Sequence, residues 1–353
     1  MDVRGVFSRL LTPPDQGPCS LGEAEAEDVF TGLLEGRWEE PQIAAMLALL
    51  QARGPTVDEL VGGARAMRRF VTVVPCRGET QGQLGPVIDT CGTGGAPKTF
   101  NISTASAIVT AAAGGPSVVR VAKHGNRSRS GRGSAEVLGA LGVNVDASHE
   151  VQARCLDELG VCFCFAIHAH PAMKHASGVR RSLAFPTIFN LLGPLTNPAR
   201  ASRQVIGVYG RTEAEKVAAA LARLGATRAM VVHGFDGMDE ITTRDRTHVF
   251  EVAGGVMTPT SIDVLDLGVS RPPQGALETR DLAHSVEIVR GVIEGDARAS
   301  TSARDIVLVN AGAALVVSGA AKSIREGMNA AASAIDSGAA KELLTRLVDY
   351  SKA

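Results

Sequence analysis

The stretch VIDTCGTGGAPKTFNIST at residues 87–104 indicates the fold of this chain. Its first part, Val87–Cys91, is a short apolar run with the length of a buried strand. A glycine-rich turn, Gly92–Gly95, follows, and Ala105–Ala113 beyond the stretch is typical of a helix. A strand that leads through such a turn into a helix predicts an α/β unit.

The same alternation continues along the chain and predicts a mostly parallel central sheet covered by helices on both faces. No pattern is readable in residues 255–285. The further predicted strands are Val118–Ala122, Cys162–Ala166, Val205–Tyr209 and Ala229–His233, and the further predicted helices are Ser134–Leu141, Glu213–Leu224, about 303–317 and about 322–350.

The N-terminal part has a different, helical periodicity. After a loose arm at residues 1–20, apolar residues recur at helical spacing from Leu21, and two more helices are predicted at Pro41–Gln51 and Thr56–Phe70. A linker at 76–86 follows. We therefore predict a small all-α domain at 1–75 and a large α/β domain at 76–353.

Composition restricts the class of function. The 353 residues carry 36 basic and 37 acidic side chains, so the chain lacks the basic excess of a dedicated nucleic-acid binder. The six cysteines form no CxxC pair, which favours reduced thiols in the cytoplasm. Met1–Leu11 lacks the apolar stretch of a signal peptide, and Ile306–Ala321 is short for a membrane span, so we expect a buried core helix there.

Two loops have the residue types of anion-binding sites. The turn Gly92–Gly95 exposes backbone N–H groups, and Ser103 or Thr104 stands where the next helix begins. The second loop, Lys123–Ser134, carries four cations with glycines and serines. Polyphosphate binding explains this composition. The alternatives are an ordinary capped turn for the first loop, and a solvated charge run or a nucleic-acid contact for the second.

Two further features add to this prediction. Asp239 and Glu240 follow a predicted strand, and adjacent carboxylates on a loop can hold Mg²⁺. Arg180 could bind a ligand carboxylate with its planar guanidinium group. Taken alone, each is more typical of plain surface charge.

Seven motifs in this order resemble the anthranilate phosphoribosyltransferase family. They are GTGG at 92–95, NIST at 101–104, KHGNR at 123–127, GSAEVLGALGV at 133–143, HPAMKH at 170–175, TIFNLLGPLTNP at 187–198 and DGMDE at 236–240. The resemblance implies the fold shared with pyrimidine nucleoside phosphorylases, with helices near 170–200 completing the small domain. It also implies an active site between the domains and a cytoplasmic homodimer formed through the small domain.

The resemblance implies a role for each matching residue. Two Mg²⁺ ions are expected, with Ser103 as ligand of one and Asp239 with Glu240 as ligands of the other. No general base is assigned, since an aromatic amine is already a neutral nucleophile, and His124 is the one candidate. Phosphoribosyl pyrophosphate would contact Gly92, Thr93, Gly94, Gly95, Thr99, Asn101, Ser103, Thr104, Lys123 and Ser130, and anthranilate would contact Gly92, His124, Asn126, His170, Arg180 and Gly193.

The sequence departs from the family pattern at two places. Ala96 stands where the family usually has Asp, and the loops 96–99 and 127–133 each look one residue short. Two other functions therefore stay open at this point. One is a pyrimidine nucleoside phosphorylase of the same fold, and the other is a non-catalytic relative that binds nucleic acid through residues 123–132.

Overall fold

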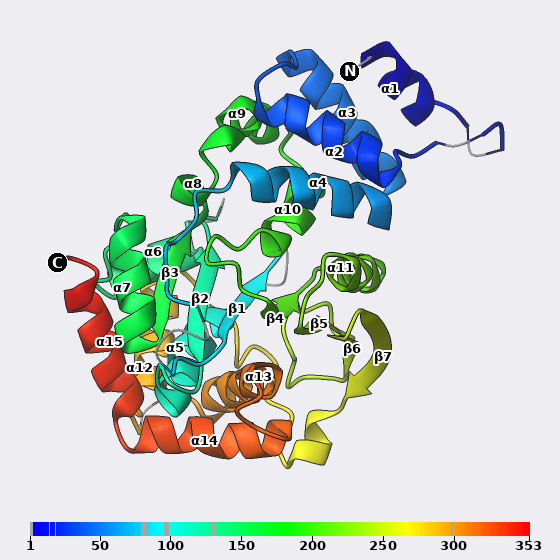
Figure 1. The fold of residues 1–353 in the computed structure, drawn as a ribbon. Coiled ribbons are helices and arrows are strands. Elements are labelled where there is room, and N and C mark those ends of the chain that lie inside the picture. The colour runs from blue at the N-terminus through cyan, green and yellow to red at the C-terminus, as the bar shows by residue number, and fades with distance from the viewer. Residues whose placement is uncertain are drawn as a thin grey trace.

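A computed structural model describes residues 3–13, 15–17, 19–78, 83–94, 99–128, 131–297 and 299–353. A helical bundle lies at one end of the molecule and a helix-covered sheet forms the rest (Figure 1). The fold class predicted from the sequence is confirmed. The helices of the N-terminal bundle are α1 (Val3–Leu10), α2 (Glu23–Leu34), α3 (Glu40–Arg53) and α4 (Val57–Phe70).

The N-terminal arm differs from its prediction, because Val3–Leu10 is helical rather than loose. Val6 and Leu10 of this helix are buried, and the Phe7 ring meets the Trp38 ring edge-on at 6.0 Å. A short helix is marginal by itself, so this contact with the bundle is what stabilises it. The capping box of Thr56 and Glu59 starts α4 where the sequence predicts it.

A sheet of seven strands forms the centre of the larger part, in the order β3-β2-β1-β4-β5-β6-β7. The first five in this order are parallel, whereas β5–β6 and β6–β7 pair antiparallel. The hairpin β6–β7 lies partly in the segment that the sequence left unread. The strands are β1 (Val87–Gly92), β2 (Arg120–Gly125), β3 (Val161–Phe165), β4 (Arg203–Gly207), β5 (Arg228–Gly234), β6 (Thr247–Ala253) and β7 (Val256–Ile262).

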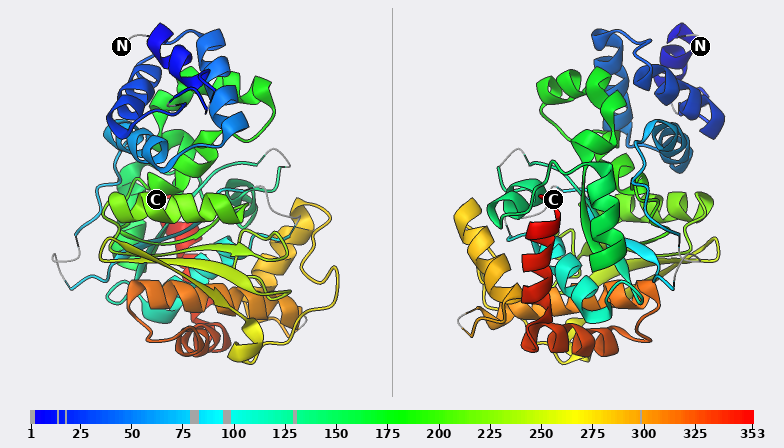
Figure 2. Two further views of the ribbon diagram at one scale, coloured as in Figure 1. Left: turned by 90° about the vertical axis from the view of Figure 1, so that its right-hand side faces the viewer. Right: turned by 60° about the vertical axis from the view of Figure 1, so that its left-hand side comes forward.

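Helices cover both faces of the sheet, with α11 on one side and α13 on the other (Figure 2). The predicted helix at 322–350 is two helices, because Gly338 adopts φ +80° between them. The helices of this part are α5 (Ile102–Gly114), α6 (Ser134–Ala140), α7 (His149–Leu159), α11 (Arg211–Arg223), α12 (Leu282–Ile293), α13 (Thr301–Ser318), α14 (Ile324–Asp336) and α15 (Ala339–Tyr350), with a 3-10 turn η3 (Val264–Leu267).

The segment near 170–200 returns to the N-terminal bundle, where α9 packs on α2 and α3 and α10 packs on α3 and α4. One apolar core joins this bundle to α11 and to one face of the sheet, through residues such as Ile206 and Val231. The domain division at residue 75 stays a prediction. The elements of the returning segment are α8 (Ala166–Ala169), η1 (Pro171–Met173), α9 (Lys174–Leu183), α10 (Ile188–Leu192) and η2 (Gly193–Leu195).

Helix α13 has the length and composition of a membrane span. However, 78% of it is buried inside the protein. It packs against α5 and α14 and belongs to the core on the other face of the sheet. It is therefore a core helix, as the sequence predicts. The six cysteines are free thiols.

Candidate active site

The glycine-rich turn leaves the carboxyl end of β1 and is held by its neighbours. Thr93 N donates to Gly207 O at 2.9 Å, and Tyr209 N donates to Thr93 Oγ1 at 3.2 Å. Gly94 adopts φ +68°, a conformation that favours glycine. Gly92 and Gly94 are exposed, so their backbone is open to a ligand. Gly95, with Ala96 and Lys98, lies outside the described residues.

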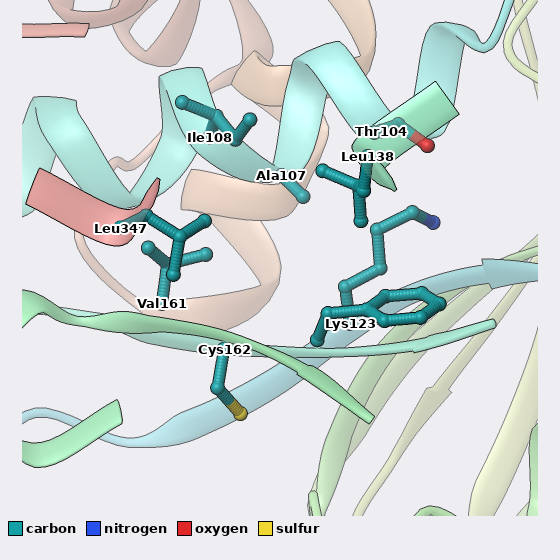
Figure 3. Close-up of a pocket in the computed structure, with 9 residues that line it drawn as sticks. Thr104, Ala107, Ile108, Lys123, Leu138, Val161, Cys162 and Leu347 are labelled. Carbon is teal, nitrogen blue, oxygen red and sulfur yellow. The ribbon is translucent and has the colours of Figure 1, made fainter. Parts of the chain in front are cut away.

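Lys123, near the end of β2, points at the start of α5. Its ammonium group donates to Thr90 O at 2.7 Å and to Ser103 Oγ at 3.1 Å. Figure 3 shows the Lys123 side chain extending from the sheet towards Thr104. Burial lowers the pKa of Lys123, and the carboxylates of Asp89 and Glu240 counteract this effect. The cation is thus held between the glycine-rich turn and the start of the helix.

Thr104 has a different position from Ser103. Its side chain is fully buried, and its hydroxyl has no hydrogen-bond partner. It lines a cavity of about 10 Å³ between α5 and the sheet, together with the Lys123 stem (Figure 3). That volume holds about one water molecule, so this cavity is not a substrate site. Ser103, by contrast, is only half-buried.

Asp239 and Glu240 follow β5 and face the same turn. Ser103 N donates to Glu240 Oε1 at 3.1 Å, and the backbone of Gly94 lies beside the Asp239 carboxylate. Burial raises the pKa of Asp239, and burial together with the Asp239 charge raises the pKa of Glu240 to about 8. Two adjacent carboxylates in this setting favour a nearby cation.

The oxygen ligands offered by Ser103, Asp239 and Glu240 suit magnesium. Two carboxylates and the Ser103 hydroxyl are oxygen ligands, which Mg²⁺ prefers. Among the residues that the structure describes, no group of three or more His, Cys, Asp or Glu is placed to hold a metal by itself. Magnesium is commonly bound by one or two carboxylates plus substrate phosphates, so a pair fits this use.

The second loop starts at the carboxyl end of β2, beside the first. Asn126 is exposed, and its side chain accepts a hydrogen bond from Arg127 N at 2.8 Å. Asn101 Nδ2 donates to Arg132 O at 3.1 Å, which joins the two loops. Ser130 lies outside the described residues. Both predicted anion loops therefore meet at the carboxyl ends of β1 and β2, and β5 ends on the same side of the sheet.

The side chains of His124 and His170 lie together, with their ring centroids 5.2 Å apart. Burial and the neighbouring His170 lower the pKa of His124 to about 3, and burial lowers that of His170 to about 4. The backbone of Gly193 lies beside the His124 ring and partly offsets this lowering of its pKa. A group with a pKa near 3 is a poor proton acceptor at neutral pH, so His124 is not suited to be a general base.

Arg180 stands on α9, towards the helical bundle. Its guanidinium carbon lies 5.2 Å from the centroid of the Phe189 ring, a cation–π distance. Asn190, next to Phe189, donates to Thr93 O at 3.4 Å. Helix α10 therefore links the Arg180 region to the glycine-rich turn.

Comparison with known proteins agrees with this geometry. Residues 84–341 match the model of the glycosyl transferase family, a/b domain, and residues 16–71 match that of its helical bundle domain. An anthranilate phosphoribosyltransferase of Rubrobacter xylanophilus is 46% identical over 334 residues, 94% of either chain. One of Anaeromyxobacter sp. (strain K) is 49% identical over 330 residues, covering 93% of this chain and 94% of the other. The chain belongs to the anthranilate phosphoribosyltransferase family.

Solved structures agree with this assignment. Anthranilate phosphoribosyltransferase from Thermus thermophilus matches with a TM-score of 0.88 and 36% identity over 100% of both chains. The Saccharomyces cerevisiae anthranilate phosphoribosyltransferase in complex with PRPP and Mg matches in fold, with a TM-score of 0.85 and 23% identity over 99% of this chain and 98% of the other.

Sequence reasoning missed the residues that position this family site. Asp89, buried in β1, accepts hydrogen bonds from His124 N at 3.0 Å and from Asn197 Nδ2 at 2.8 Å. Asn310 of α13 accepts from Ile241 N and donates to Ile241 O, both at 3.0 Å, which fixes the loop of the carboxylate pair. A polar residue inside an apolar run was the available signal in each case.

Gly207 was missed as well. A Cβ at this position would lie 1.6 Å from Asp239 O, so only glycine lets the end of β4 approach this loop. A Cβ on Gly92 would lie 3.3 Å from Gly207 O and 3.4 Å from Asp239 Oδ2, so this position is tight but less crowded than Gly207. The close packing of β4 against the carboxylate loop therefore depends on Gly207. Pairing of distant segments of this kind has no signature in a single sequence.

Proposed function

We propose that this chain transfers the phosphoribosyl group from phosphoribosyl pyrophosphate to anthranilate, which gives N-(5-phosphoribosyl)anthranilate and pyrophosphate in tryptophan biosynthesis. The observation that carries the proposal is the convergence of Lys123, Ser103 and Glu240 beside the exposed glycine-rich turn. Relatives 44–49% identical over nearly the whole chain carry the name of this enzyme.

The diphosphate donor binds at the carboxyl ends of β1, β2 and β5. Exposed backbone at Gly92 and Gly94 suits the approach of phosphate oxygens. Lys123 supplies a fixed positive charge for them. The residues proposed to contact the donor are Gly92, Thr93, Gly94, Gly95, Thr99, Asn101, Ser103, Thr104, Lys123 and Ser130. Since its side chain is buried, Thr104 takes part through its backbone.

Magnesium is the proposed cofactor, with two ions held by Ser103 on one side and by Asp239 and Glu240 on the other. When bound, it neutralises charge on the diphosphate. The Ser103 N–H holds the Glu240 carboxylate in place. Asn310 holds the loop that carries both carboxylates. The protein thus keeps its oxygen ligands oriented towards the donor.

Anthranilate approaches along residues between the carboxyl ends of strands β1, β2 and β5 and the helical bundle. We assign Gly92, His124, Asn126, His170 and Gly193 to this path. Arg180 offers its guanidinium group to the substrate carboxylate. The two histidines, neutral at pH 7, provide an uncharged surface for an aromatic ring.

The reaction breaks the bond between ribose C1 and the diphosphate oxygen and forms a bond between C1 and the amine nitrogen. Negative charge grows on the leaving diphosphate, and Lys123 with the backbone N–H groups of the turn stabilises it. The neutral amine attacks the cation-like C1, and its extra proton passes to water. Positioning of the two substrates supplies much of the acceleration.

We place the enzyme in the cytoplasm as a homodimer formed through the helical bundle. The exposed Leu11, at the end of α1, belongs to this bundle, and its side chain is 63% exposed. Light scattering coupled to size-exclusion chromatography measures the assembly. A mass of about 73 kDa, twice the chain mass of 36.6 kDa, supports the dimer. A single-chain mass contradicts it.

Product formation from anthranilate and phosphoribosyl pyrophosphate, with and without Mg²⁺, tests the function directly. We expect N-(5-phosphoribosyl)anthranilate to form from anthranilate only when both the sugar donor and Mg²⁺ are present. Phosphorolysis of a pyrimidine nucleoside without transfer to anthranilate would instead identify the phosphorylase. Binding of single-stranded DNA that is lost at moderate salt, with no turnover, would identify the nucleic-acid-binding relative.

A further inference from the structure

Arg244 stands four residues beyond Glu240, on the loop between β5 and β6. Its side chain is 22% exposed, yet its Nε and Nη2 atoms are buried and have no hydrogen-bond partner. The carboxylate Oε1 of Glu278 lies 3.9 Å from Nη2, which is beyond hydrogen-bond distance. Burying unpaired N–H groups of a cation costs free energy, so this arrangement is suited to an additional anionic acceptor.

The loop holds Arg244 in a defined place. Thr242 Oγ1 donates to Asp236 Oδ2 at 2.9 Å and accepts from Arg244 N at 3.0 Å. Ile241, the residue before Thr242, is bound on both its N–H and C=O by Asn310. Arg244 is therefore fixed relative to the carboxylate pair, rather than mobile on a free loop.

The guanidinium group of Arg244 lies close to the segment around Thr99. Glu278, its nearest carboxylate, forms a β-bridge with Thr99. Thr279 Oγ1 also donates to Thr99 O at 3.4 Å. Glu240 thus lies against Ser103 at the start of α5, and Arg244 lies near Thr99.

We propose that Arg244 binds an oxygen of the diphosphate of phosphoribosyl pyrophosphate and remains bound to pyrophosphate until that product leaves. The proposal rests on the proposed function, because it needs a diphosphate donor at this turn. The diphosphate is favoured over the 5-phosphate because Arg244 shares its loop with the carboxylates assigned to Mg²⁺. A guanidinium fork forms strong, directional bonds to phosphate oxygens.

Calorimetric titration of the full chain with inorganic pyrophosphate and Mg²⁺ tests the assignment. We expect Arg244→Ala to weaken pyrophosphate binding roughly tenfold to a hundredfold, the loss of one charged hydrogen-bonded contact. Arg244→Lys keeps the charge but not the planar guanidinium group, so its pyrophosphate affinity should lie between those of the wild type and Arg244→Ala. The matched control is Arg246→Ala, because Arg246 is exposed on the same loop over the Phe235 ring, and this variant should bind pyrophosphate as tightly as the wild type.

Three results would overturn the inference: unchanged pyrophosphate affinity in Arg244→Ala, an equal loss in Glu278→Ala, or weakened binding of ribose 5-phosphate alone. An equal loss in Glu278→Ala would show that Arg244 acts only by holding the 278–279 segment in place. Thermal unfolding of each variant checks that it is folded. Wild-type protein that binds pyrophosphate but transfers nothing to anthranilate contradicts the proposed function. Transfer to anthranilate with unchanged pyrophosphate affinity in Arg244→Ala contradicts this inference alone.

Discussion

The backbone N–H of Ser103 donates to the Glu240 carboxylate at 3.1 Å across 137 residues of sequence. Ser103 lies in the first turn of α5, where the helix dipole places partial positive charge. The bond joins the first anion loop to the loop after β5 that carries Asp239 and Glu240. The predictions below depend on this convergence or on the residues that support it.

Replacement of Arg180 should affect one substrate more than the other. We expect Arg180→Ala to raise the KM for anthranilate about tenfold or more, the loss of a charged contact, with a much smaller change for phosphoribosyl pyrophosphate. Steady-state kinetics with each substrate varied in turn measures both constants. Arg181→Ala, its exposed neighbour, is the control. Equal increases in the two KM values would remove Arg180 from the carboxylate-binding role.

Removal of the carboxylate pair should change the metal requirement. The double variant Asp239→Asn, Glu240→Gln keeps the shape but not the charge, so we expect activity to need a higher Mg²⁺ concentration. Product formation across a MgCl₂ series measures the shift. Asp245→Asn, on the same loop, should behave like the wild type. An unchanged Mg²⁺ dependence in the double variant would sink the ligand assignment.

His170 should make the fold sensitive to acid. Its pKa is about 4 in the folded chain and near 6.5 when unfolded, so the unfolded state binds more protons between these values. Stability therefore falls as pH drops below about 6.5. One such group contributes a loss of about 2 kcal/mol between pH 7.5 and pH 5.

Urea unfolding at both pH values tests this effect in wild type and His170→Gln. The variant should lose about 2 kcal/mol less on acidification, whatever its stability at pH 7.5. Comparing each protein with itself separates the titration from any change in packing. Identical acid dependence in the two proteins would show that the His170 pKa is not lowered by burial.

Gly207→Ala should disrupt the carboxylate loop. Because the new Cβ would lie 1.6 Å from Asp239 O, we expect a loss of stability of about 3 kcal/mol or more and loss of Mg²⁺-dependent activity. Gly139→Ala is the matched control, because Gly139 stands in α6 with nothing within 4 Å of its added Cβ. That change should be neutral or stabilise slightly. Chemical unfolding measures both, and a stable, active Gly207→Ala would refute the packing argument.

Several element predictions failed where tertiary contacts override local pattern. Strand β2 begins at Arg120 rather than at residue 118, and the Arg120 guanidinium is fully buried against Asp157 at 2.7 Å. A charged residue at the first position of a buried strand gives no apolar signal. Strand β7 was unreadable because most of its side chains are exposed and it contains Pro259, which an edge strand tolerates.

By itself the sequence determined what depends on neighbouring residues: the α/β alternation, the helical N-terminus, and the loops that carry Lys123 and Asp239 with Glu240. These follow from apolar periodicity and from glycines placed between a strand and a helix. Motif order also identified the family before any coordinates.

Only the tertiary structure decided which groups meet. The contacts of Ser103 with Glu240, of Asn310 with Ile241 and of Gly207 with the Asp239 loop join segments that local pattern treats separately. The same holds for the buried Nε and Nη2 atoms of Arg244, which have no hydrogen-bond partner although the residue looks like surface charge in the sequence. The physical reason is that burial and charge pairing depend on distances in space, and those are set by how the strands order within the sheet.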